Sequence, residues 1–124
     1  MLETLWIGLG GILGSIARFW LSWFVHQFLG AEFPYGTLLV NITGCFYAGF
    51  IGTMAEERYL FSPQTRMFLL IGVLGSFTTF SSFGYETLEL FKEGSFLRAS
   101  LNVGSNVFFC LLRVWLGSTT SRLL

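Results

Sequence analysis

The chain has 124 residues, of which 53% are hydrophobic and only 11% are charged, and its formal net charge is zero. This is the composition of a membrane protein. No stretch is long and polar enough for a soluble domain, and no glycine-rich phosphate loop ending in Lys-Ser or Lys-Thr is present, which excludes a nucleotide-driven pump.

Four segments are apolar enough to cross a bilayer: residues 5–28, 36–55, 67–91 and 96–117. A bilayer core of ~30 Å needs about 20 helical residues. The first segment has no basic leader and no cleavage site, so we expect a retained helix and not a signal peptide. The sequence therefore predicts an all-α membrane protein with four transmembrane helices in a single domain, residues 1–124.

The first span contains one deep arginine. Arg18 lies roughly 20 Å along the helix from Leu5. Its side chain either extends to the far interface or forms the electropositive wall of a water-filled vestibule, which would attract anions. Small residues recur at four-residue spacing in the first two spans and predict close helix packing and an oligomer. They are Gly10, Gly14, Gly44, Ala48 and Gly52.

Polar residues deep in the spans are almost all neutral. Only Glu86 brings a carboxylate toward the membrane interior, whereas proton-coupled exchangers and cation carriers generally need one at depth. Neutral amides and hydroxyls bind an ion without trapping it, which favours a channel. Asn102, Ser105 and Asn106 form one stripe of the fourth span, which either binds a neighbouring helix or lines a pore. Cys45 and Cys110 have no CxxC spacing and are expected to be small core residues.

The third span contains the sequence GSFTTFSSFG, residues 75–84. Its phenylalanines, Phe77, Phe80 and Phe83, would share one face of a regular helix. Adjacent Thr and Ser pairs among glycines weaken a helix, so we predict a break near the middle of this span. Unwound backbone at membrane depth must be buried or line a cavity, and its freed carbonyls can coordinate a cation.

Positive charges near the span ends are nearly balanced. The face that holds the termini carries Arg58, Arg66 and Arg122, and the opposite face carries Lys92 and Arg98. So weak a bias leaves two interpretations open: an ordinary protein with its termini inside, or copies that insert in both orientations and pair antiparallel.

Three motifs together resemble the Fluc or CrcB fluoride-channel family. They are GGILGSIARF (residues 10–19), PYGTLLVNITG (34–44) and GVLGSFTTFSSF (72–83). The resemblance implies a passive fluoride-selective channel in the cell membrane (inner or plasma), surrounded by lipid. Such a channel exports fluoride down its electrochemical gradient and so reduces cytoplasmic fluoride toxicity. The resemblance further implies an antiparallel, dual-topology homodimer with a structural sodium ion at its centre.

The resemblance also implies roles for individual residues. Phe80 and Phe83 would be the pore phenylalanines and Asn41 the pore amide. The backbone carbonyls of Gly75 and Thr78 would hold sodium. Arg18 would be the vestibule arginine. The remaining polar positions of the pathway would be Thr37, Ser81, Glu86, Asn102, Asn106 and Cys110. In the fourth span the family often has a track of Tyr and Ser residues, where this chain has Asn102, Asn106 and Cys110.

Two other hypotheses fit a small four-span protein. A dual-topology multidrug exporter has a similar size, but its chemistry needs a carboxylate within the first span, where this chain has only Glu3 before Glu32. A non-conducting subunit, or one member of a heterodimer with a paralogous chain, is the third hypothesis. An enzyme is not expected, because no nucleophile, base and orienting group occur together.

Overall fold

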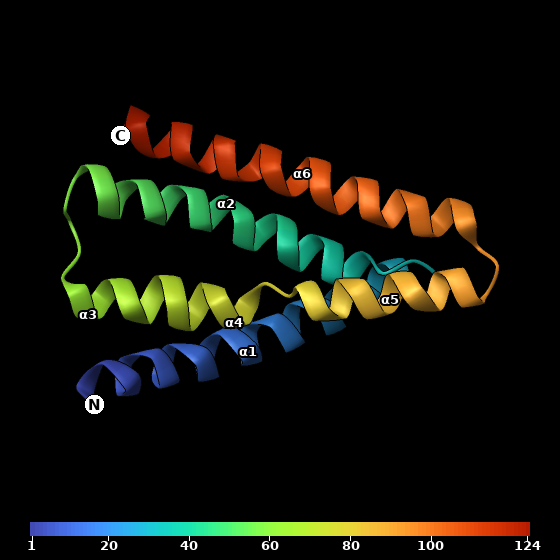
Figure 1. Ribbon diagram of the computed structural model, residues 1–124, viewed down its shortest axis with the longest axis horizontal. Coiled ribbons are helices and arrows are strands. Elements are labelled where there is room, and N and C mark those ends of the chain that lie inside the picture. Colours follow the sequence, from blue (N-terminus) through green and yellow to red (C-terminus); the bar gives the residue numbers. More distant parts are fainter.

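The computed structural model describes all residues, Met1–Leu124, as a bundle of four long helical segments lying side by side (Figure 1). They are α1 (Leu2–Leu29), α2 (Tyr35–Glu57), a third segment Pro63–Lys92 and α6 (Phe96–Leu123). All four are long and apolar enough to cross a membrane, which confirms the prediction of four such helices. Both termini lie at the same end of the bundle (Figure 1).

The third segment consists of four pieces: α3 (Pro63–Arg66), a π-helical stretch η1 (Met67–Leu74), α4 (Gly75–Phe77) and α5 (Phe80–Lys92). Between α4 and α5 the backbone is extended, with φ −77° and ψ 151° at Thr78 and φ −145° and ψ 119° at Thr79. The predicted break is therefore confirmed and lies at the Thr-Thr pair, where the ribbon in Figure 1 is unwound.

The second threonine of the pair starts the next helix. The Oγ1 atom of Thr79 accepts a hydrogen bond from the backbone N–H of Ser82 at 3.1 Å, as an N-cap does. The first threonine closes the helix before it, because the hydroxyl of Thr78 donates to the carbonyl of Leu74 at 3.0 Å. Local side-chain bonds thus satisfy backbone groups on both sides of the break.

The break separates Phe77 from the other two phenylalanines, so the three do not share one face as they would on a regular helix. The Phe77 ring lies against Gly44 of α2. Phe80 is 82% exposed, whereas Phe83, one turn further along α5, is 8% exposed. The rings of Phe80 and Phe83 still meet edge to face, with centroids 5.3 Å apart.

Close packing at glycine occurs as expected between α1 and the third segment. A Cβ atom on Gly10 would collide with the Phe68 carbonyl oxygen, and one on Gly14 would collide with that of Val73. Gly44 meets the methyl group of Thr78. Gly52 makes no such close approach within the chain, since a Cβ atom there would have no neighbour within 4 Å.

Helices α2 and α6 run parallel and pack more extensively than any other pair. Their contacts keep one register, with partners 65 residues apart: Asn41 with Asn106, Thr53 with Ser118, and Glu57 with Arg122. Gly49 meets Val114 at one position between these pairs, and Cys45 and Cys110, also 65 residues apart, line the same cavity at another. We call this set the α2–α6 ladder; its members recur every four residues along both helices, so they follow one face of each.

Candidate functional site

The side chain of Asn41 holds the helix break in place. Its Oδ1 atom accepts a hydrogen bond from the Thr79 N–H at 2.8 Å, and its Nδ2 atom donates to the Thr79 carbonyl at 3.0 Å. Both residues are buried, each with 9% of its surface exposed. Since an unpaired buried backbone group is costly in a membrane, Asn41 replaces the bonds that Thr79 would make in a continuous helix.

A chain of buried hydrogen bonds leads from Asn41 across α6 to α5. Asn41 Nδ2 also donates to Asn106 Oδ1 at 3.2 Å, and Asn106 Nδ2 donates to Asn102 Oδ1 at 3.0 Å. Asn102 Nδ2 then donates to the Thr87 hydroxyl at 2.9 Å, which itself donates to the Phe83 carbonyl at 2.7 Å. The sequence left open whether the polar stripe of α6 binds a neighbour or lines a pore; in this chain Asn102 and Asn106 bind neighbouring helices, and Asn106 also lines a cavity.

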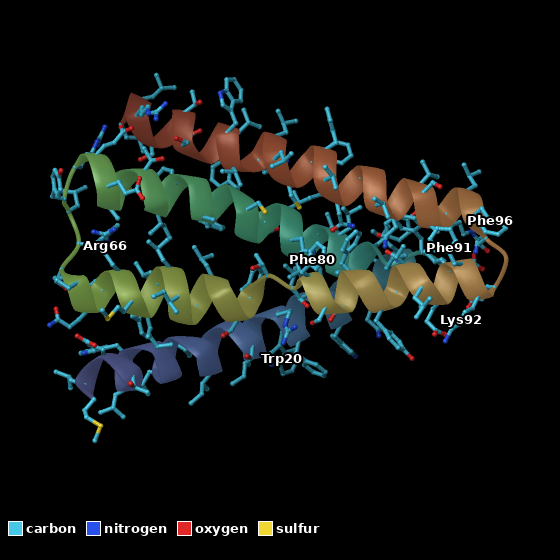
Figure 2. All side chains as sticks on the ribbon, viewed as in Figure 1. Trp20, Arg66, Phe80, Phe91, Lys92 and Phe96 are labelled. Atoms are coloured by element: carbon cyan, nitrogen blue, oxygen red, sulfur yellow. The ribbon has the colours of Figure 1, made fainter.

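A cavity of about 350 Å³ lies beside the break, on the side of α2 and α6. Phe80 and Phe83 contribute aromatic surface to it, and Asn41 and Asn106 contribute amides. Figure 2 shows Phe80 at the break between α4 and α5, far from both ends of the bundle, which are marked by Arg66 and Lys92. The remaining lining residues are Cys45, Thr78, Thr79, Val107, Cys110 and Leu111.

A second, more polar cavity of about 220 Å³ lies on the other side of Thr79, toward α1. It is lined by Arg18, Thr37 and Glu86, together with Ser15, Phe19, Ser22, Val40 and Ser82. The Thr37 hydroxyl donates to Glu86 Oε1 at 2.6 Å, whereas Glu86 Oε2 is buried without a hydrogen-bond partner. Arg18 is half-buried and makes no ion pair with Glu86.

A third hollow of about 570 Å³ opens at the end of the bundle where α5 meets α6 and α1 meets α2. It shares Glu86 with the second cavity, as the second shares Thr79 with the first. Its walls are strongly charged and include the Arg98–Glu32 pair, whose closest N···O distance is 3.9 Å. The three hollows therefore follow one another along the bundle, from the break to its end.

The remaining predicted residues lie at the break itself. Ser81 is exposed, and its Oγ lies 3.3 Å from Thr79 Oγ1. Gly75 is exposed and Thr78 is half-buried, and only Thr78 lines the first cavity. The Thr79 N–H, which would bond to the Gly75 carbonyl in a continuous helix, donates to Asn41 instead.

Sequence reasoning missed two residues that organise the site. Thr79 stood among the deep polar groups without a role, yet it lines two cavities and caps α5. A threonine directly before the first residue of a helical pattern, here Phe80, is the N-cap signal that points to it. Thr87, which joins Asn102 to α5, carries no local pattern that distinguishes it.

A four-span bundle with a broken third span, a break held by an amide and a series of hollows beside it is the architecture of a multi-pass membrane protein with an interrupted transmembrane helix. The chain belongs to the CrcB family: the family model described as CrcB-like protein, Camphor Resistance (CrcB), matches residues 5–118.

Curated relatives carry a more specific name. The chain is 47% identical over 118 residues to a protein of Methylocella silvestris, covering 94% of this chain and 90% of the relative. It is 45% identical to a protein of Geotalea daltonii, with 98% of each chain covered. It is 50% identical to one of Opitutus terrae, with 91% and 87% covered. Each of these proteins is named fluoride-specific ion channel FluC.

Proposed function

We propose that this protein is a passive fluoride-selective channel of the cell membrane, which exports fluoride down its electrochemical gradient and so reduces its toxicity in the cytoplasm. The observation that carries the proposal is the cavity at the break, where Phe80 and Phe83 meet the amides of Asn41 and Asn106. It lies in a chain that is 47% identical to a protein named as a fluoride channel.

The chemistry of this cavity suits a small anion. A phenyl ring has a positive edge, and an amide N–H or a hydroxyl donates a hydrogen bond without carrying a full charge. Several weak donors in succession replace part of the water shell of fluoride and still release the ion, as conduction requires. We assign Phe80, Phe83, Asn41 and Asn106, which line the cavity, and Ser81 at the break to this part of the pathway. We assign Asn102 to its support, because Asn102 is buried and bonds to Asn106.

The second cavity supplies an approach to the break from the first helix. Arg18 places a positive charge there and raises the local concentration of anions. Thr37 and Glu86 are polar positions of the same approach, with the Thr37 hydroxyl held by the Glu86 carboxylate. Because Thr79 borders both cavities, an ion that leaves the second cavity reaches the phenylalanines beside Thr79.

Fluoride flux from liposomes tests the channel proposal. Purified protein should dissipate a fluoride gradient once a potassium ionophore supplies the counter-ion path, and an equal chloride gradient should persist. Flux no faster than from protein-free liposomes would reject a channel formed by this chain alone, and co-expression with a paralogous chain would then test the heterodimer. Fluoride uptake driven only by a proton gradient would favour an exporter over a passive channel.

We also propose that two copies pair in opposite orientations. Two features support this: the near balance of positive charge between the two ends of the bundle, marked by Arg66 and Lys92 in Figure 2, and the exposure of Phe80 at mid-bundle, where a second chain would cover it. Light scattering in detergent should then give the mass of two chains.

Orientation can be read from the connection between α2 and α3. In a background with Cys45→Ser and Cys110→Ser, the exposed Leu60 is replaced as Leu60→Cys, and intact spheroplasts are treated with a membrane-impermeant maleimide. About half of the chains should react, because half present this loop outside. Labelling of all chains or of none would contradict dual topology.

We further propose that the backbone carbonyls of Gly75 and Thr78 hold a structural sodium ion at the centre of the dimer. The residues fit this role, because Thr79 bonds to Asn41 and so leaves the Gly75 carbonyl without its helical partner. A bound sodium ion would supply a fixed positive charge at the break. Replacing sodium with N-methyl-D-glucamine throughout purification should shift the protein from dimer to monomer on a sizing column, and an unchanged dimer would count against this site.

A further inference from the structure

The two cysteines of the chain lie side by side in the α2–α6 ladder. Cys45 follows Asn41 by one turn of α2, and Cys110 follows Asn106 by one turn of α6, so the thiols occupy the next position in the same register. Both are half-buried and line one cavity, between the Asn41–Asn106 hydrogen bond and the Gly49–Val114 contact. Tight packing further along the ladder, where Gly49 meets the Val114 carbonyl, holds the two helices at this separation.

The thiols also face the cavity at the break. Cys45 and Cys110 line the same cavity of about 350 Å³ as Phe80, Phe83 and Asn106. The expectation that they are small core residues does not account for their position on this wall. A reagent that enters the cavity therefore meets two thiols at once, one turn of helix away from the amide pair Asn41–Asn106.

The residues around the two thiols determine which kind of metal ion the pair can bind. No third His, Cys, Asp or Glu joins the thiols, so a tetrahedral zinc site cannot form. Two sulfur ligands match a soft ion that prefers two-coordinate linear geometry. A divalent ion of this kind, bound to two thiolates, leaves the site with no net charge, which matters because an uncompensated charge within a membrane span is costly.

We propose that Cys45 and Cys110 form a binding site for a thiophilic divalent metal ion such as Hg²⁺, and that the bound ion closes the pathway at the break. Each thiol loses its proton to water as its metal–sulfur bond forms, so one Hg²⁺ releases two protons and no electrons are transferred. Binding depends only on the thiol pair. Closure rests on the proposed channel function, because the metal would occupy the cavity beside Phe80 and Phe83.

The binding test uses the whole protein in detergent and HgCl₂ as the probe. Because the chain has only two cysteines, the ultraviolet mercury–thiolate absorption reports this site alone. Wild type should bind one Hg²⁺ per chain and retain it against a modest excess of free cysteine. The single variants Cys45→Ser and Cys110→Ser should lose the metal to free cysteine at least tenfold more readily. Retention in a single variant equal to that in wild type would overturn the paired site.

The flux test compares each protein with its own rate before metal is added. Hg²⁺ should slow fluoride flux through wild type at least tenfold, dithiothreitol should restore it, and each single variant should recover once free cysteine is added. Flux through wild type that is unchanged by bound Hg²⁺ would overturn the closure. Should wild type conduct no fluoride, the channel proposal fails, while the absorption titration still decides the metal site. Counting maleimide-reactive thiols in wild type with and without Hg²⁺ decides the site even if a variant does not fold.

Discussion

The side-chain amide of Asn41 on α2 makes two hydrogen bonds to the backbone of Thr79: it accepts from the Thr79 N–H and donates to the Thr79 carbonyl. The two residues are 38 positions apart in the sequence, so this is a tertiary contact between two spans. It fixes where the third span is interrupted. It also fixes the position of Phe80, the first residue of α5, relative to α2 and α6.

Replacing Asn41 with alanine should destabilise the break. Asn41→Ala leaves the buried Thr79 N–H and carbonyl without partners and also removes a donor to Asn106, and we expect a loss of about 2 kcal/mol in the free energy of unfolding. Fluoride flux should fall at least tenfold. Denaturation in mixed detergent with SDS measures the first effect, and liposome flux measures the second.

Thr43→Ala is the matched control, because Thr43 lies on the same helix and is half-buried without a side-chain hydrogen bond to any other residue. It should change the unfolding midpoint far less than Asn41→Ala does. Equal destabilisation by the two variants would mean that the Asn41 bonds add nothing specific.

The N-cap of α5 should depend on the hydroxyl of Thr79. Thr79→Val keeps the shape of the side chain but removes the acceptor for the Ser82 N–H, and the expected cost is about 1 kcal/mol of unfolding free energy. Thr79→Ser keeps the acceptor and should remain closer to wild type in stability. A valine variant as stable as wild type would show that the cap contributes nothing to stability.

Hydropathy and local side-chain chemistry were enough to predict the four spans and the break in the third. Long apolar runs predict the four spans, and the Thr-Thr-Phe-Ser-Ser sequence predicts the break because both Thr and Ser compete for backbone bonds. Local sequence does not show that Asn41 reaches Thr79, or that α2 and α6 share a 65-residue register, since both depend on how distant spans pack. For the same reason the spacing of small residues does not single out Gly49 as a glycine of α2 that contacts α6.

The two phenylalanines at the break, Phe80 and Phe83, should differ in how their replacement affects stability. Phe80 is mostly exposed in the protomer and Phe83 is buried, so Phe83→Ile should lower the free energy of unfolding by about 1 kcal/mol and Phe80→Ile by much less. Both should slow fluoride flux at least tenfold, because isoleucine has no polarised ring edge.

Phe108→Ile provides the control for these variants, since Phe108 is 62% exposed on α6 and does not line the cavity at the break. It should leave both stability and flux close to wild type. If Phe80→Ile conducts as fast as Phe108→Ile, the ring of Phe80 has only a packing role.

Alanine at two glycines of α2 should shift stability in opposite directions. A Cβ atom on Gly49 would overlap the Val114 carbonyl of α6, so Gly49→Ala must push the ladder apart, at a cost of about 1–3 kcal/mol. Gly52 has open space around it, and Gly52→Ala should stabilise the helix by roughly 0.5–1 kcal/mol, because alanine is the better helix former. SDS-induced unfolding of the two variants beside wild type measures both effects under one condition.

Since Asn41 meets Asn106 two turns before Gly49 in the same ladder, Gly49→Ala should also slow fluoride flux, whereas Gly52→Ala should not. Gly52→Ala destabilising the protein as much as Gly49→Ala would mean that α2 packs on α6 in a different register.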